Sequence, residues 1–414
     1  MKKGMAVRKS VRSGGIFLMG TFAVGIAQAE AQVPTFNLDD PPVAAVSGES
    51  LGTLFTLRAQ IHEQYDDNAL RLGDHQAVPA GMTKGDFSTI GTVGGSVQTP
   101  VAAQVLFLDG QYSMTRYARD SVLNADNYAL DGGIRWSVTP VCSGVLIASY
   151  ASVQSDLSDL LVPVSNEEKS TTFDEKGTCR VSDHLTWGLD GGWLSRDNST
   201  QAEAFADVRQ EHVSSTLTYA IHNLYAAGIE TNYTTSEFPH RSQGLGGGVA
   251  TSTDQTDAVV FYRRHLTPKL EVGVNAGMTW AAQSGTTSTI PTYGAHVRWL
   301  ATPKLLFEFI NQRTVSTPDV VQANFVTTES QTFNANWAYS PKVTFTASAA
   351  YATVDYRGGA DRQDTKETFG LFAGYQLTPM VQATVGYHLI DQQTVNPSVN
   401  LSSNVFMIAL AFTR

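Results

Sequence analysis

The sequence has few charged residues and no long apolar run after its N-terminal region. Only 16% of its 414 residues are charged, well below the share of about a quarter that is usual for a soluble domain. No later segment holds the roughly 20 apolar residues of a membrane-spanning helix. These two features argue against an ordinary soluble domain and against a helical membrane protein.

Basic residues are scarce as well. The chain has 28 lysines and arginines against 38 aspartates and glutamates. Five of the basic residues and none of the acidic ones lie in 1–29, so the acidic excess rises from ten to fifteen charges without that segment. Because nucleic-acid binding needs a basic surface, we expect no nucleic-acid partner.

Catalytic and metal-binding motifs are also missing. The nine histidines and two cysteines show no zinc-ligand spacing. The glycine-rich segment 244–248 follows no βα unit, so it indicates a loop tip and not a phosphate site. Pairs such as Ser348 and His388 can be drawn, but nothing in the sequence selects them as nucleophile and base. We predict a protein without enzymatic activity, metal or cofactor.

What the sequence does have is a regular series of tight turns. Each turn separates two runs in which apolar and polar residues alternate, the pattern of a strand with one apolar and one polar face. Proline cannot donate a hydrogen bond within a sheet, so we expect the prolines of these turns outside the strands. Such a repeated antiparallel hairpin is typical of a transmembrane β-barrel. The turns are expected at 98–100, 138–140, 181–183, 221–223, 266–268, 301–303, 340–341 and 377–379.

The repeat predicts an all-β fold, a transmembrane antiparallel up-and-down β-barrel of about 18 strands, with 16 also possible. Two strands flank each turn, one strand at 54–65 precedes them, and one at 404–413 follows them. An even strand number, short periplasmic turns and longer extracellular loops are features of bacterial outer-membrane barrels. The long segments between hairpins, such as 66–85, 235–255 and 282–291, are therefore expected outside the cell.

The N-terminus predicts a secretory signal peptide. Its basic start precedes an apolar stretch too short to span a membrane as a helix. The Ala-x-Ala segment at 27–29 matches a cleavage site, and the one at 29–31 is the alternative. We expect 1–29 to be cleaved, 30–50 to form a periplasmic lead-in and 51–414 to form the barrel in the outer membrane.

Alternation assigns the two faces of each predicted strand. In 270–280, apolar residues occupy every second position, and glutamate, asparagine, threonine and glycine lie between them. A charged side chain facing lipid at the membrane midplane costs about 2–4 kcal/mol, so the polar set must face the lumen. Aromatic residues near the turns match an interfacial girdle. The candidate lumen-lining residues are Arg58, Gln60, His62, Asp131, Arg135, Asp190, Glu271, Asn275, His296, Arg298, Glu308, Gln382 and His388.

A lumen of this size suits an aqueous channel. Weak, repeated hydrogen bonds along its wall would suit the passage of a sugar chain, since a tight site would stall it. The alternative for any one charged candidate is a structural ion pair within the wall. The acidic partners available for such pairs are Asp131, Asp190, Glu271 and Glu308.

The two cysteines lie near the periplasmic ends of neighbouring predicted strands. Cys142 opens one strand and Cys179 closes the next. The periplasm permits disulfides, and adjacent antiparallel strands bring Cα atoms close enough for a bridge. A Cys142–Cys179 disulfide and a pair of free thiols are the two alternatives.

A short segment after the first predicted strand carries a family resemblance. Residues 65–74 read YDDNALRLGD, and the segments YSMTRY at 112–117 and NADNYALDGGIRWSV at 124–138 follow in order. In these segments and their layout, the chain resembles the EpsL-type outer-membrane barrels of exopolysaccharide operons, within the β-barrel porin families. The positions that match the family motif are Tyr65, Asp66, Asp67 and Asn68.

The resemblance implies a channel that helps to export a bacterial exopolysaccharide. The implied partners are the polymer and a periplasmic polysaccharide-export component, in addition to outer-membrane lipid. Two other functions stay open: a general or sugar-selective diffusion porin, with 66–85 or 235–255 as a constriction loop, and a plugged structural barrel. We expect a monomer, because no predicted strand carries an obvious subunit interface.

Overall fold

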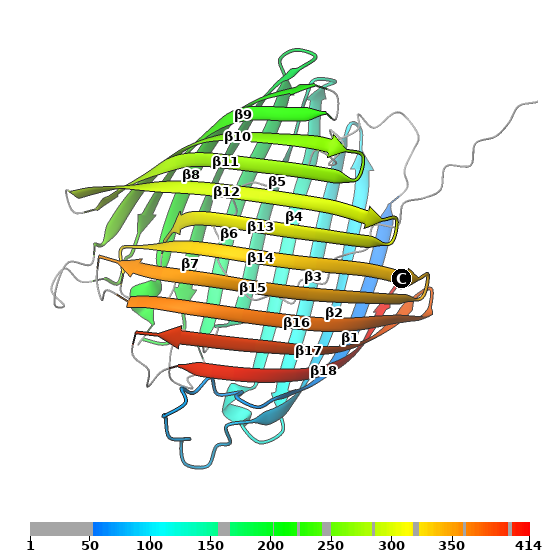
Figure 1. Ribbon diagram of the computed structural model, residues 1–414, viewed down its shortest axis with the longest axis vertical. Helices are drawn as coiled ribbons and strands as arrows, with labels where there is room; N and C mark the ends of the chain where they lie inside the picture. The colour runs from blue at the N-terminus through cyan, green and yellow to red at the C-terminus, as the bar shows by residue number, and fades with distance from the viewer. Residues whose placement is uncertain are drawn as a thin grey trace, which may run out of the picture. The chain divides into compact units, whose positions relative to one another are not determined.

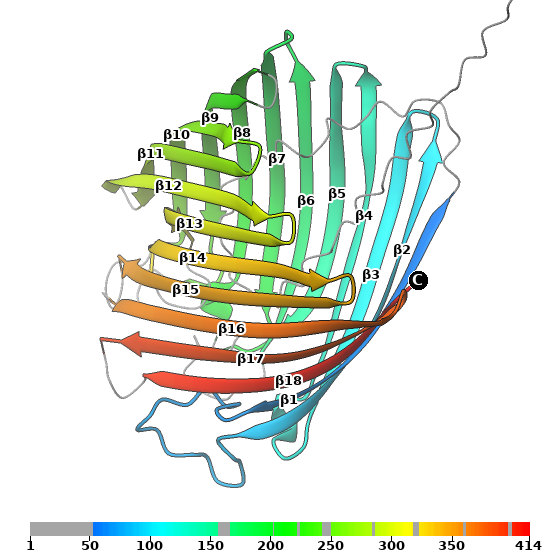
Figure 2. The same cartoon turned by 45° about the vertical axis from the view of Figure 1, so that its right-hand side comes forward.

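The computed structural model describes residues 53–155, 166–201, 203–221, 224–241, 250–283, 286–317, 323–358, 362–395 and 400–414. Within these residues, 18 strands form one antiparallel sheet (Figure 1). The sheet closes on itself, because β1 pairs with both β2 and β18 (Figure 2). The predicted signal peptide and periplasmic lead-in lie outside the described residues.

The strands follow one another around the barrel in chain order, with two short 3-10 turns in the loops. Their bounds are β1 Leu54–Asp66, β2 Asp86–Val101, β3 Gln104–Tyr117, η1 Ser121–Leu123, β4 Ala125–Thr139, β5 Cys142–Gln154, β6 Glu167–Arg180, β7 Leu185–Asn198, η2 Ala204–Ala206, β8 Val208–Ile221, β9 Tyr225–Glu237, β10 Ser252–Thr267, β11 Leu270–Gln283, β12 Thr286–Thr302, β13 Leu305–Ser316, β14 Phe325–Ser340, β15 Val343–Arg357, β16 Arg362–Thr378, β17 Val381–Thr394 and β18 Leu401–Thr413.

The prediction of a closed, up-and-down antiparallel barrel is confirmed, with 18 strands and not 16. Closure leaves the sheet without the free edges that promote pairing between molecules. In the part of the chain that the structure describes, no helix is long and apolar enough to cross a membrane.

The first tight turn differs from the prediction. It lies between Val101 and Gln104, and Pro100 belongs to β2, opposite Val105 of β3. Pro291 likewise lies within β12. Both prolines occupy positions where the strand extends beyond one neighbour: the β1–β2 pairing stops at Gln98 and the β12–β13 pairing at Tyr293. Each proline therefore behaves as an edge residue, where a missing N–H donor costs little.

The predicted outer loop at 282–291 is also mostly strand. β11 continues to Gln283 and β12 begins at Thr286, and the two strands pair to their ends. The sequence indicated a loop because threonine and serine replace the apolar residues at the outer end of this hairpin. The hairpin extends past the last pair between β12 and β13, Tyr293 with Arg313.

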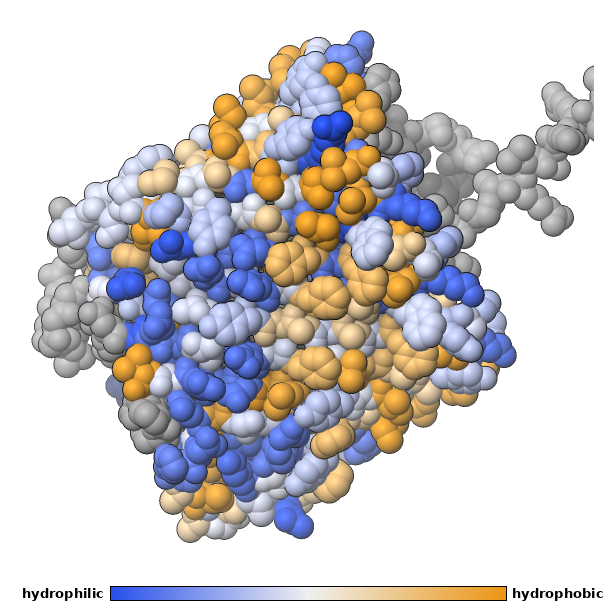
Figure 3. Space-filling view, viewed as in Figure 1, coloured by the Kyte–Doolittle hydropathy of each residue, from blue (hydrophilic) through white to orange (hydrophobic). Residues whose placement is uncertain are grey.

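The apolar side chains of the barrel wall point outward. Side chains alternate between the two faces of a strand, and away from the strand ends the large exposed apolar residues fall on every second position. Figure 3 shows apolar residues dominating near the tight turns and polar residues near the loops. The exposed aromatic residues near the turns include Trp187, Trp299, Trp337, Tyr339 and Tyr375. A lipid-facing apolar belt with aromatic residues at its edge is the arrangement expected in an outer membrane.

The two cysteines face each other across neighbouring strands. Cys142 of β5 is the register partner of Cys179 of β6, and their Cα atoms lie 4.1 Å apart. The structure joins them in a disulfide. This bond links two strands near the periplasmic turns.

Candidate functional site

The polar lumen is the candidate functional site, and alternation determines which side chains reach it. In β4, Leu130 is an exposed apolar residue on the outer face, so Asp131 points inward. The same alternation places every predicted lumen residue on the inner face. Their role in conduction stays a prediction.

The inner face of β1–β13, here called the charged arc, carries most of the lumen's charge. Several of its charges form ion pairs: Arg58 with Asp109 at 2.6 Å, and Arg298 with Glu308 at 3.3 Å. Carboxylates outnumber permanently cationic groups there. The charged side chains of this arc include Arg58, Asp109, Asp131, Arg135, Asp174, Lys176, Asp190, Glu230, Asp257, Arg263, Glu271, Arg298 and Glu308.

Two further predicted residues are held by histidines in the charged arc. Asp190 lies 3.0 Å from Nε2 of His212, and Glu271 lies 3.6 Å from Nδ1 of His265. The sequence analysis considered ion pairs within the wall as the alternative role of the charged candidates. The structure forms one such pair between Arg298 and Glu308. Among the described residues, Asp131 forms no ion pair, and Arg58 binds the neighbouring Asp109. The other predicted residues are spread around the wall without gathering into one site: Gln60, His62, Asn275, His296, Gln382 and His388.

The inner face of β14–β18, here called the neutral arc, differs sharply. Its inward residues between rim and turns are mostly amides, hydroxyls and small side chains. Among the described residues of these five strands, permanent inward charges are confined to Arg362, Asp364 and Lys366 at the outer end of β16. The polar residues of this arc include Asn334, Asn336, Thr344, Thr346, Ser348, Thr368, Gln382 and Thr384.

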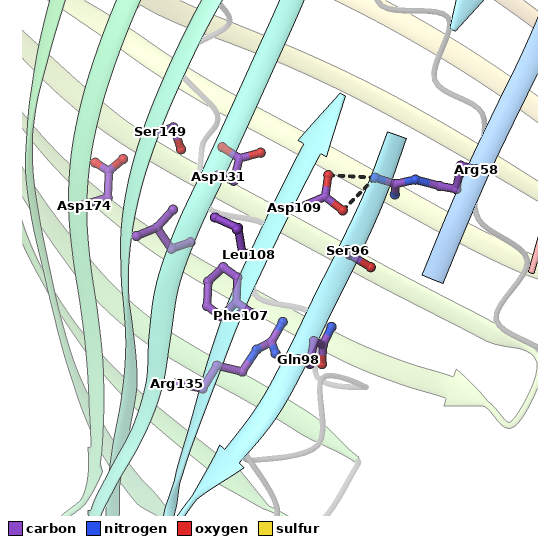
Figure 4. Close-up of a pocket in the computed structure, with 11 residues that line it drawn as sticks. Arg58, Ser96, Gln98, Phe107, Leu108, Asp109, Asp131, Arg135, Ser149 and Asp174 are labelled. Carbon is purple, nitrogen blue, oxygen red and sulfur yellow. Dashed lines mark hydrogen bonds and ion pairs between the residues drawn. The ribbon is translucent and has the colours of Figure 1, made fainter. Parts of the chain in front are cut away.

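A pocket of about 520 Å³ opens in the charged arc across β1–β6 (Figure 4). Asp131 and Arg135 of β4 lie at it, and Arg58 reaches it from β1. Figure 4 shows Arg58 extending across β2 to the carboxylate of Asp109. The guanidinium of Arg135 lies 4.7 Å from the centre of the Phe107 ring. The pocket therefore combines opposite charges with an aromatic surface.

Of the eleven residues that line this pocket, sequence reasoning named only Arg58, Asp131 and Arg135; those it missed include Phe107, Asp109 and Asp174. Phe107, Asp109 and Asp174 occupy inward positions next to an outward apolar residue, Leu108 or Phe173, so alternation alone would have placed them in the lumen. Their meeting in one pocket depends on the register of six strands, which alternation within a single strand does not reveal.

The family-like motif lies at the seam between the first and last strands. Asp66 accepts hydrogen bonds from Arg71 and from the Ser403 hydroxyl, both at 2.6 Å. Asp67 accepts two from Asn404, at 2.7 Å each. Asn68 is fully buried and donates to the carbonyls of Leu72 and Ser402.

These contacts tie the outer end of β1 to β18, and we call Asp66, Asp67, Asn68 and Arg71 the seam clamp. Because protein groups occupy these polar atoms, their arrangement supports barrel closure and leaves little for a sugar. The apolar residues that follow the motif, such as Leu70 and Leu72, pack against Leu123 of the β3–β4 loop. The start of 66–85 is thus a folded part of the outer rim.

A second group of loops meets at Arg241, outside the spanning strands. Its Nε donates to the carbonyl of Phe205 at 3.0 Å and its Nη1 to that of Ala323 at 3.1 Å. The guanidinium lies 3.3 Å from the centre of the Phe238 ring. Burial lowers the pKa of Arg241 to about 10, so it stays charged at neutral pH. The loops after β7, β9 and β13 are thereby joined, although 242–249 of the predicted constriction loop lie outside the described residues.

No metal site is formed by the described residues, since no three histidine, cysteine, aspartate or glutamate side chains are grouped to hold an ion. A catalytic role is not indicated by any observed geometry. The absence of enzymatic activity and of a cofactor stays a prediction.

Comparisons with known proteins agree with this architecture. The family model described as "Putative beta-barrel porin 2" matches residues 252–414, which cover β10–β18. No curated protein matches the chain. The FrpB iron transporter of Neisseria meningitidis (F3-3 variant) is similar in structure, with a TM-score of 0.50 and 10% identity over 82% of this chain and 62% of its own. This chain thus spans less than two thirds of that transporter.

Two barrels of Pseudomonas aeruginosa are also similar. OpdL has a TM-score of 0.48 and 12% identity, over 87% of this chain and 99% of its own. OccK3 (OpdO) has a TM-score of 0.49 and 12% identity, over 87% of this chain and 95% of its own. The present chain is a porin-like β-barrel of the bacterial outer membrane. At 10–12% identity, the similarity to these proteins concerns the fold alone. The solute that passes this porin-like barrel depends on the residues of its own lumen.

Proposed function

We propose that the barrel is an outer-membrane channel through which a bacterial exopolysaccharide leaves the cell. The observation that carries the proposal is the neutral arc, which lines five successive strands with amides, hydroxyls and small side chains. Such groups exchange hydrogen bonds with sugar hydroxyls as readily as with water. Weak, repeated contacts of this kind favour movement along a wall, and a lumen of 18 strands is wide enough for a hydrated chain.

The family-like motif supports this proposal by stabilising the closure of the barrel, and we do not assign it a contact with the sugar. In the seam clamp its polar atoms bind protein groups. The export function therefore rests on the lumen, together with the resemblance in layout to EpsL-type barrels. A periplasmic polysaccharide-export component would deliver the polymer to the turn side, and a single chain would suffice for the conduit.

A clean deletion strain tests the proposal. Secreted and periplasm-trapped polymer would be measured separately, with the intact chain supplied in trans as the control. We expect loss of secretion with trapped polymer, restored by the intact chain. Normal secretion in the deletion strain would contradict the export function.

The second candidate is a sugar-selective diffusion porin, and the pocket in the charged arc favours it. A volume of about 520 Å³ fits a short saccharide better than a continuous polymer. Liposomes that contain the purified barrel would separate the two functions. Uptake of mono- and disaccharides, combined with normal polymer secretion in the deletion strain, would favour the porin.

A further inference from the structure

We infer that the pocket in the charged arc is a binding subsite for one pyranose unit of a neutral saccharide. This inference rests on the proposed function as a saccharide channel, and it names the place in the lumen where the sugar is held. Four features of the pocket carry it: its floor, a free acceptor, a free donor and the sign of its charge.

The floor of the pocket is apolar and is formed by Phe107 and Ile147 around Gly133. Gly133 of β4 lies between its register partners Phe107 of β3 and Ile147 of β5. A Cβ atom added to Gly133 would come within 2.6 Å of the Phe107 ring, so only glycine lets the ring lie over the strand. Small-molecule sites combine such apolar surfaces with a few placed polar groups, and the C–H groups of a pyranose can pack against this apolar surface.

Asp131 supplies a hydrogen-bond acceptor at one side of this floor. It stands two residues from Gly133, on the same face of β4, roughly 7 Å along the strand. Its register partner Asp109 is bound by Arg58 at 2.6 Å. Asp131 itself has no hydrogen-bond or ion-pair partner within the ranges that the structure describes. An ionised carboxylate accepts hydrogen bonds on both oxygens, so Asp131 can take two sugar hydroxyls.

Arg135 supplies donors at the other side. It stands two residues beyond Gly133, and one of its nitrogens donates to Oε1 of Gln98 at 3.3 Å. A guanidinium has five N–H donors, and no other hydrogen bond of this group is formed with the described residues. The Phe107 ring holds the guanidinium in place. A ring on the floor would therefore meet an acceptor at one edge and donors at the other.

The charge of the pocket selects a neutral sugar over an acidic one. Asp131 and Asp174 line it beside the paired Asp109, whereas Arg135 is its cation without a carboxylate partner among the described residues. A uronate would place its carboxylate among these like charges, and such repulsion weakens binding. A neutral hexose meets no such penalty.

Current blockade in planar bilayers tests the inference on the full barrel. Maltohexaose is the neutral probe, and an oligogalacturonate of equal length is the acidic comparison. We expect brief blockades by maltohexaose. Asp131→Asn, which keeps the shape but removes the charge, should shorten their residence time about tenfold, because hydrogen bonds to charged groups are the stronger ones. Gly133→Ser, which fills the floor, should also reduce blockade.

The matched control is Asp126→Asn, the same substitution on the exposed outward face of β4, which should leave the residence time unchanged. A heat-modifiability gel confirms that each variant is folded. Equal residence times in wild type and Asp131→Asn would overturn the subsite, as would tighter binding of the oligogalacturonate. A barrel that passes no current at all would instead contradict the proposed channel function.

Discussion

The charged arc and the neutral arc are built from the same repeated hairpin, but they place different chemistry in the lumen. In the charged arc, long side chains reach across strands, as Arg58 does to Asp109 from β1 to β3. In the neutral arc, residues such as Asn334 and Ser348 are short and stay near the wall. The outward apolar face is common to both arcs and secures insertion in the membrane. From this difference we infer that the charged arc is suited to binding a solute and the neutral arc to letting a solute move along the wall.

The two arcs meet at the β13–β14 pairing and at the β18–β1 seam, and the seam clamp holds the second junction at the outer rim. Two strands of the charged arc, β5 and β6, are also linked by the disulfide, on their outward face. Substitutions in the seam clamp, in the disulfide and at the charged residues test whether the two arcs contribute separately to stability and conduction.

The largest effect is expected from the disulfide, which links β5 and β6, two strands that carry the charged arc and not the neutral arc. Replacing Cys142 and Cys179 by serine should lower the free energy of unfolding by about 2–4 kcal/mol, because the link restrains the unfolded chain. Urea unfolding of the refolded barrel, with and without reductant, measures this. The double variant should not respond to reductant. A wild-type mass that does not change on reduction and alkylation would refute the link.

The next largest effect is expected at the seam clamp. Asn68→Ala removes a fully buried amide and leaves the carbonyls of Leu72 and Ser402 without that donor. We expect a loss of about 1–3 kcal/mol, the usual cost of unpaired buried groups. The temperature at which the folded band disappears on a gel reports it. Gln60→Ala on the preceding strand β1 is the control, and equal losses in both variants would argue against a clamp.

Arg58→Ala should have a smaller effect on stability and a clear one on ion selectivity. The Arg58 side chain is 43% exposed, and exposed ion pairs contribute about 0.2–1 kcal/mol. Its loss leaves Asp109 and Asp131 opposite each other without a cation. Preference for cations should therefore rise in bilayer recordings. An unchanged reversal potential would show that the charge of Arg58 does not affect the ions that pass through the lumen.

The smallest effect is expected in the loop before η2, where burial raises the pKa of Glu203. Folding thus favours the protonated acid, and the stability that this gives at low pH is lost as the pH rises through the folded pKa. Glu203→Gln should stabilise the loop at about pH 8 and have no effect near pH 4, where an unfolded glutamate is mostly protonated. Limited proteolysis at both values measures this, and a pH-independent difference would contradict the assignment.

Much of the fold could be predicted because a barrel strand repeats one simple rule. Alternation located the strands, and it gave the inward face of residues as distant as Arg58 and His388. Pro100 and Pro291 were misplaced because strand extension beyond a neighbour is set by the shear of the whole barrel. The Arg58–Asp109 pair was missed because the two residues lie on strands that are not adjacent, β1 and β3, and are 51 residues apart in the chain. The role of Asn68 was hidden for a similar reason, since its partner Ser402 lies at the other end of the sequence.

The reversal potential of the wild-type channel in a potassium chloride gradient tests the central claim most directly. Carboxylates outnumber cationic groups in the charged arc, and the neutral arc adds permanent charge only near its rim. Lumen charge of one sign concentrates counter-ions. The channel should therefore prefer potassium, and Asp131→Asn with Asp174→Asn should reduce that preference. A preference for chloride, or the absence of any current, would contradict a water-filled lumen whose charged arc governs what enters.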